Sequence, residues 1–160
     1  MALRNIRVED DPILRKHSRI VDKFDQRLQM LIDDMFDTMY DANGVGLAAV
    51  QVGVLKQVIV IDTGEEGEKL VLINPQIIAE EGEQHTPEGC LSIPGKSAVC
   101  KRPQKVTVRA LDRDGQEYEK TGEDLLAKAF CHEIDHLSGI LYIDKAESEI
   151  VNVEEEPDEE

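Results

Sequence analysis

The residues best suited to chemistry lie in the segment His132-Glu-Ile-Asp-His136. On a helix, two histidines four residues apart project from the same face, where both imidazoles can reach one metal ion. Glu133 lies beside that face and can exchange a proton with a water on the ion. This HExxH spacing predicts a catalytic metal site, although two half-buried histidines bonded to backbone carbonyls would leave the same pattern.

The third metal ligand has to come from another segment. Metzincin proteases supply a third histidine six residues after the second, and this chain has Tyr142 there. Glu147 and Glu149 lie further on, close to an acidic tail and without a strong helical pattern. Cys90, in Glu88-Gly-Cys-Leu-Ser92, is the better candidate, because a thiolate and two histidines leave a tetrahedral ion with one open position for water.

The other cysteines and histidines have weaker surroundings. Cys131 adjoins His132 and so points about 100° away around the helix, which favours a core position. Cys100 has no partner at ligand spacing and is expected to be a buried or idle thiol. His17 and His85 have no motif around them, and either of them as a fourth ligand would close the site.

A small-residue segment, Gly44-Val-Gly-Leu-Ala-Ala-Val-Gln51, adds a further element of the site. Its glycines allow close backbone approach, and the Gln51 carboxamide can donate to an oxyanion without competing for a proton. By itself the segment is more typical of a Gly-rich turn followed by small-residue packing.

These motifs need helices and strands to position them. Apolar spacing predicts a helix from Asp22 to about Asn43, with Asp22 as its N-cap, and a second from about Gly122 to Leu137, with Thr121 and Asp124 as its capping box. An Asp-Gly turn at 112–115 indicates a hairpin, and short connections favour antiparallel sheets. The strands are expected at 57–62, 69–74, 76–80, 105–111, 116–119 and 140–143.

Composition limits the class of protein. The 160 residues fit one domain, expected over 1–146, and the net charge of −16 argues against binding to DNA, RNA or an anionic membrane. Residues 147–160 carry eight acidic side chains and no basic one, so they are expected to form a flexible tail. The chain shows no signal-peptide pattern and no long apolar run, which favours a cytoplasmic protein.

The three motifs, 44–51, 88–92 and 132–136, in this order and spacing, resemble those of the peptide deformylase family. Further likeness lies at 11–14, 73–75 and 110–115, so the resemblance covers nearly all of residues 2–145. It implies an α+β fold with mainly antiparallel sheets around a central helix that carries the HExxH motif. It also implies that the protein removes the formyl group from the N-terminal formyl-methionine of nascent proteins and releases formate.

The resemblance also assigns roles to residues. Cys90, His132 and His136 would bind one divalent metal ion, usually Fe²⁺ and replaceable by Zn²⁺, Ni²⁺ or Co²⁺. Glu133 would take the proton from the attacking water and return it to the leaving amine. The Leu91 backbone N–H and the Gln51 side chain would hold the oxyanion. The methionine and peptide backbone would be received by Gly44, Val45, Gly46, Gly89 and Leu125.

Two departures from the family pattern concern partners. Better-known members have a basic C-terminal helix that docks on the ribosome, whereas residues 153–160 are acidic, so ribosome association is expected to be weak or absent. Some members grip the peptide with an arginine that is missing from 95–98, which leaves that contact to Lys96 or Arg102 or to neither. An HExxH-type metallopeptidase and a catalytically inactive homologue stay open as alternatives.

Overall fold

A computed structural model describes residues 2–153 of the chain. Two helices and two antiparallel sheets make up the fold, joined by three short 3-10 helices at Pro12–Arg15, Ala49–Val52 and Tyr142–Lys145. The elements in order are α1 (Gln26–Asp41), β1 (Gly46–Ala48), β2 (Val58–Asp62), β3 (Lys69–Glu81), β4 (Gln84–Cys90), β5 (Ile93–Arg102), β6 (Lys105–Leu111), β7 (Glu117–Glu123), α2 (Leu125–His136) and β8 (Val151–Asn152).

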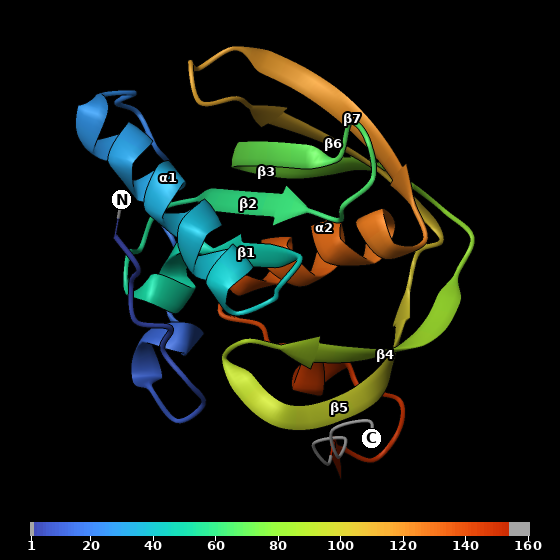
Figure 1. Ribbon diagram of the computed structural model, residues 1–160. Helices are drawn as coiled ribbons and strands as arrows, with labels where there is room; N and C mark the ends of the chain where they lie inside the picture. The colour runs from blue at the N-terminus through green and yellow to red at the C-terminus, as the bar shows by residue number, and fades with distance from the viewer. Residues whose placement is uncertain (1, 154–160) are drawn as a thin grey trace, which may run out of the picture.

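The sheets lie on opposite sides of α2 (Figure 1). The larger sheet has the order β1-β2-β3-β6-β7 and the smaller has β4-β5-β8, and neighbouring strands in both are antiparallel. The prediction of mainly antiparallel sheets is therefore confirmed. Strands β1 and β4 are edge strands of their own sheets, and each contains part of a sequence motif.

Apolar packing holds α2 against the larger sheet. Leu126, Ala127 and Phe130 of the helix pack with Ile59 and Val108 of the sheet in one buried cluster. A second buried cluster joins α1 to the same sheet. Burial of large apolar side chains stabilises a fold by about 1.5–3 kcal/mol each, so these clusters fix the position of α2.

Helix α1 and strand β3 differ from the sequence prediction. The α1 helix begins three residues later than expected, because Asp25 and not Asp22 is the N-cap, its side chain accepting the N–H of Leu28. The two strands expected at 69–74 and 76–80 are one strand, β3, with a register shift at Pro75 where Asn74 has φ 52°. A proline removes one ladder hydrogen bond, which the bulge accommodates.

The start of α2 was also predicted wrongly. Strand β7 continues to Glu123, so Thr121 pairs with Thr107 across the hairpin and does not cap the helix. The chain turns at Asp124, whose φ is 54° and whose side chain makes no capping bond. The expected last strand at 140–143 is not formed either, since a 3-10 helix covers Tyr142–Lys145.

The smaller sheet was not foreseen from the sequence. Its strands β4 and β5 contain glycine, proline and charged residues, which hide the usual strand pattern. The segment expected to be a flexible tail takes part in this sheet, because Glu147 donates its N–H to the Val99 carbonyl and β8 pairs with Lys96 and Ser97. The rest of that segment, 154–160, lies outside the described residues.

Candidate active site

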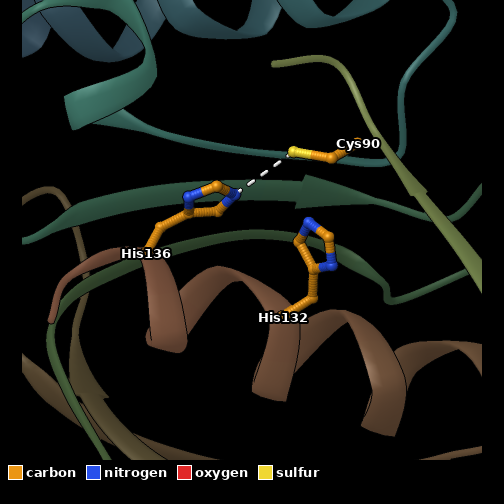
Figure 2. A group of neighbouring side chains, drawn as sticks. All are labelled: Cys90, His132 and His136. Atoms are coloured by element: carbon orange, nitrogen blue, oxygen red, sulfur yellow. Dashed lines mark hydrogen bonds between the residues drawn. The ribbon is translucent and has the colours of Figure 1, made fainter. Parts of the chain in front are cut away.

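Three side chains with ligand atoms meet between α2 and the smaller sheet. His132 and His136 project from α2 toward Cys90, which ends β4 (Figure 2). One ligand atom of each lies within 4.8 Å of the others, and the Cys90 Sγ is 3.4 Å from the His136 Nε2. Within residues 2–153 this is the one cluster with metal-ligand geometry, so the structure brings the three predicted ligands together.

The remaining cysteines and histidines lie elsewhere. Cys131 is buried in the apolar cluster under α2, where burial raises the pKa of its thiol to about 12. Cys100 lies in a separate apolar cluster. His85 bonds Glu147 and Glu83 on the surface, and His17 is exposed, so neither belongs to the cluster as a fourth ligand.

A buried carboxylate orients His132. The Glu88 Oε1 lies 2.9 Å from the His132 Nδ1, which leaves the Nε2 of this imidazole for a metal ion. Burial opposes ionisation of Glu88, but hydrogen bonds from His132 and Arg102 outweigh it and lower the pKa of Glu88 to about 2. A ligand histidine that bonds a carboxylate through its other nitrogen is typical of metal sites.

Arg102 completes this arrangement. Its guanidinium donates to both Glu88 oxygens, at 2.7 and 3.0 Å, and to Asp135 Oδ2 at 2.8 Å. Only 4% of its side chain is exposed. Of the alternatives that the sequence left open for the charged peptide contact, Arg102 is therefore excluded, because its guanidinium is buried against two carboxylates in the interior.

Glu133 lies beside the ligand cluster. It is 5% exposed, and burial raises its pKa to about 7, although the nearby His132 opposes the shift. Gly46 makes room for it, because a Cβ at this position would stand 2.7 Å from Glu133 Oε2. The sequence predicts Gly46 as a point where the substrate backbone approaches, and the structure shows that this glycine also leaves space for the Glu133 carboxylate.

Gln51 lies on the other side of Cys90. Its Oε1 accepts the N–H of Ala48 at 2.9 Å, which turns its Nε2 toward Ser92 Oγ at 3.0 Å and Cys90 Sγ at 3.6 Å. The side chain is 1% exposed and so held in one orientation. Leu91 follows Cys90 in the turn between β4 and β5.

A cavity of about 510 Å³ opens onto these residues. Val45 and Leu125 are 39% and 42% exposed, and large apolar side chains exposed in a cavity indicate a binding surface. His136 lies behind this surface and is 1% exposed. The predicted site residues that line the cavity are Gly44, Val45, Gly46, Gln51, Gly89, Cys90, Leu91, Leu125, His132 and Glu133.

The residues of the cluster fit a divalent metal ion. Burial lowers the pKa of His136, which keeps this imidazole neutral as a ligand must be. The Glu133 Oε1 and His136 Nδ1 are buried without a hydrogen-bond partner among residues 2–153. A buried polar atom without a partner destabilises the fold, so these two atoms indicate that the site binds a further group. A thiolate and two imidazoles form a donor set that suits Zn²⁺ and Fe²⁺.

Comparison with known proteins identifies the family. The polypeptide deformylase family model matches residues 3–151. A peptide deformylase of Lachnoclostridium phytofermentans is 55% identical over 161 residues, covering 100% of this chain and 99% of the relative. The chain belongs to the peptide deformylase family. It is therefore a metal-dependent hydrolase that removes N-formyl groups.

Two further matches support this. The peptide deformylase of Alkaliphilus metalliredigens is 61% identical over 145 residues, covering 91% of this chain and 97% of the relative. The crystal structure of a peptide deformylase from Legionella pneumophila superposes with a TM-score of 0.87 at 52% identity, covering 90% of this chain and 86% of the other. These matches do not favour the metallopeptidase or the inactive homologue that the motif alone had left open.

Four contributors to the site were given no role, or another role, from the sequence: Glu88, Ser92, Arg102 and Asp135. Glu88 and Ser92 stand two residues on either side of Cys90, and that position was the signal that could have revealed them. No spacing pattern connects Arg102 to Glu88, because their contact depends on the pairing of β4 with β5.

Proposed function

We propose specific roles for this chain's residues in the hydrolysis of N-terminal formyl-methionine to formate and a free amine. One observation carries the proposal: Cys90, His132 and His136 converge where Glu133 and Gln51 also face the cavity. A structural metal site does not require Glu133 or Gln51, whereas amide hydrolysis needs a residue that carries a proton and a donor to the oxyanion.

Cys90, His132 and His136 would hold one divalent ion. The donor set accepts Fe²⁺, Zn²⁺, Ni²⁺ or Co²⁺, and we propose Fe²⁺ in the cell. When bound, the ion supplies a Lewis acid that polarises the formyl carbonyl and lowers the pKa of a water. Metal analysis of protein purified without oxygen tests this choice, and bound zinc with no iron would contradict it.

Glu133 acts as the proton carrier. Its carboxylate takes the proton of the attacking water and then delivers it to the nitrogen of the leaving amine. A general acid–base residue works best when its pKa lies near the working pH, and burial raises the pKa of Glu133 to about 7. Gly46 keeps the space that this carboxylate needs.

Gln51 and Leu91 would stabilise the tetrahedral oxyanion. The Gln51 Nε2 is held next to Cys90 by the bond from Ala48 to its Oε1, so it needs little reorganisation during the reaction. The Leu91 N–H directly follows Cys90 in the chain. Loss of one such donor typically costs about 2.7–4 kcal/mol of transition-state stabilisation.

The substrate peptide would lie between β1 and β4. Both are edge strands; Gly44 and Val45 directly precede β1, Gly89 lies in β4, and all three line the cavity. An extended peptide can pair with such an edge as an added strand. Its methionine side chain would enter the apolar part of the cavity, between Val45 and Leu125.

Lys96 is the remaining candidate for a charged contact with the peptide. It lines the cavity and is 41% exposed, and its ammonium bonds Glu9 at 3.3 Å. Arg102 is excluded from this role by its burial. Lys96→Met is expected to raise KM for formyl tripeptides severalfold without lowering kcat, and an unchanged KM would exclude the contact.

Formate release tests the catalytic proposal. The iron-loaded protein, assayed without oxygen, is expected to release formate from a formyl-Met tripeptide and to leave internal peptide bonds intact. Glu133→Gln is expected to keep one metal ion per chain and to lose about 10²–10⁴-fold in kcat, the usual range for a general acid–base residue. Full activity of this variant would refute the role of Glu133.

We also propose that the protein acts in the cytoplasm, where formylated chains are made. No helix within residues 2–153 has the length and apolar character to span a membrane. The acidic residues at 154–160 oppose contact with ribosomal RNA, although they lie outside the described residues. Co-sedimentation with ribosomes is expected to be weak, and removal of 154–160 is expected to strengthen it.

A further inference from the structure

One lysine, Lys128, lies in the part of the cavity wall that α2 contributes, between the apolar Leu125 and Ala129. Leu125, Lys128, Ala129 and His132 all line the cavity from the same face of the helix. Lys128 is one turn, about 6 Å, from His132 toward the start of the helix. A side chain that enters beside Glu133 and runs along α2 toward Leu125 therefore passes Lys128.

The ammonium of Lys128 is held in place by strand β4. Its Nζ donates to Thr86 Oγ1 and to the Pro87 carbonyl, each at 3.1 Å. Pro87 also lines the cavity, so the lysine links the part of the lining that comes from α2 to the part that comes from β4. An ammonium has three donors, and these two bonds use two of them.

We propose that Lys128 extends the substrate range of this enzyme to peptides that begin with formyl-methionine sulfoxide. Methionine oxidation turns an apolar thioether into a polar sulfoxide with a strong acceptor oxygen. In a purely apolar pocket that oxygen would lose its hydrogen bonds to water and weaken binding. The third N–H of Lys128 supplies the missing donor, and the formyl group is then hydrolysed as in the unoxidised peptide.

The inference rests on the proposed placement of the methionine side chain between Val45 and Leu125. Under this inference Lys128 determines substrate specificity, in addition to connecting α2 with β4 through its hydrogen bonds. A link alone would affect all substrates equally, whereas a donor to the sulfoxide would affect only the oxidised one. The ratio of the two activities separates these roles.

The test compares kcat/KM for formyl-Met-Ala-Ser with that for each sulfoxide epimer of the same peptide, using iron-loaded enzyme. The variants are Lys128→Met, which keeps the aliphatic stem and loses the ammonium, and Lys128→Gln, which keeps a donor. We expect the sulfoxide-to-methionine ratio to fall about tenfold or more in Lys128→Met, as loss of a charge-assisted hydrogen bond does. In Lys128→Gln the ratio is expected to fall less, because the carboxamide can still donate to the sulfoxide oxygen.

Lys96→Met is the matched control, because it removes an ammonium from another part of the same cavity. Its ratio is expected to equal that of the wild type. An equal fall in Lys96→Met, or an unchanged ratio in both Lys128 variants, would overturn the inference. Because the ratio is taken within each variant, a general loss of activity cancels. Failure of the wild type to release formate from formyl-Met-Ala-Ser would instead refute the proposed function.

Discussion

The two sheets that enclose α2 hold it by different forces. The larger sheet contacts the helix through buried apolar side chains such as Ile59, Val108 and Phe130. The smaller sheet contributes Cys90 to the ligand cluster and contacts the helix through the Glu88–Arg102 pair, with 2.7–3.0 Å bonds that reach His132 and Asp135. Apolar packing is non-directional and fixes where the helix lies, whereas hydrogen bonds are directional and fix how its side chains point.

This difference suits a metal site. A ligand imidazole has to present one nitrogen in one direction, and Glu88 enforces that for His132. The contact of the larger sheet with α2 is apolar and does not set the direction of a ligand imidazole. Single substitutions can remove the contribution of one sheet while leaving that of the other.

The largest effect is expected from Cys90→Ala in the smaller sheet. This variant removes the thiolate ligand, so it should lose the metal ion and with it all measurable deformylase activity. Metal content per chain and formate release measure both losses. Cys100→Ala is the control, because its thiol is buried in the same sheet outside the ligand cluster. A metal ion retained by Cys90→Ala would mean that the third ligand is another residue.

Arg102→Met is expected to have the next largest effect. It leaves Glu88 and Asp135 without their partner, and loss of one member of a buried ion pair costs about 3–5 kcal/mol of unfolding free energy. Metal affinity should fall as well, because Glu88 would no longer be fixed beside His132. Urea denaturation and metal competition measure the two effects.

Arg109→Met serves as its control in the larger sheet. Arg109 is 43% exposed and pairs with Glu119 on the surface, so its loss should cost no more than about 1 kcal/mol. If both arginine variants lost the same stability, the ion pairs of the two sheets would be equivalent and the comparison would fail.

Ile59→Ala in the larger sheet is expected to reduce the unfolding free energy by about 2–5 kcal/mol, because it opens a cavity in the fully buried apolar cluster. Metal stoichiometry and affinity should not change, since Ile59 has no polar contact with the ligands. Ile78→Ala in the same sheet is the exposed control, with a change within about 0.5 kcal/mol. Loss of metal in Ile59→Ala would show that apolar packing also orients the ligands.

The smallest effect is expected at the rim of the smaller sheet. The protonated imidazole of His85 donates hydrogen bonds to Glu147 and Glu83, and these bonds, the one to Glu147 first, raise its pKa above the unfolded value. The contribution of these bonds to folding stability is fully present below the unfolded pKa of His85, about 6.5, and is lost as pH rises through the higher folded pKa. His85→Gln should therefore lower Tm slightly at pH 5.5 and not at pH 9. A Tm difference independent of pH would exclude this ion pair as the cause.

The sequence predicted the larger sheet better than the smaller one. Strands β2 and β6 have continuous or alternating apolar residues, which appear in any periodicity analysis. Strands β4 and β5 bury few side chains and contain Pro87, Pro94 and Gly95, so they have no clear pattern. Their pairing is set by tertiary contacts, which the local sequence does not encode.

The sequence by itself predicted the candidate ligand set and the proposed acid–base residue. Helix geometry brings residues four apart to one face, so the spacing of His132, Glu133 and His136 already contains their arrangement. Only the tertiary structure decided the role of Arg102, which the sequence left as one of three alternatives for a contact with the substrate. Its partners are 14 and 33 residues away, and their contact exists only because β4 pairs with β5 and α2 packs beside them. Contacts between residues far apart in the chain leave no local sequence pattern, so the contacts of Arg102 could be identified only in the folded structure.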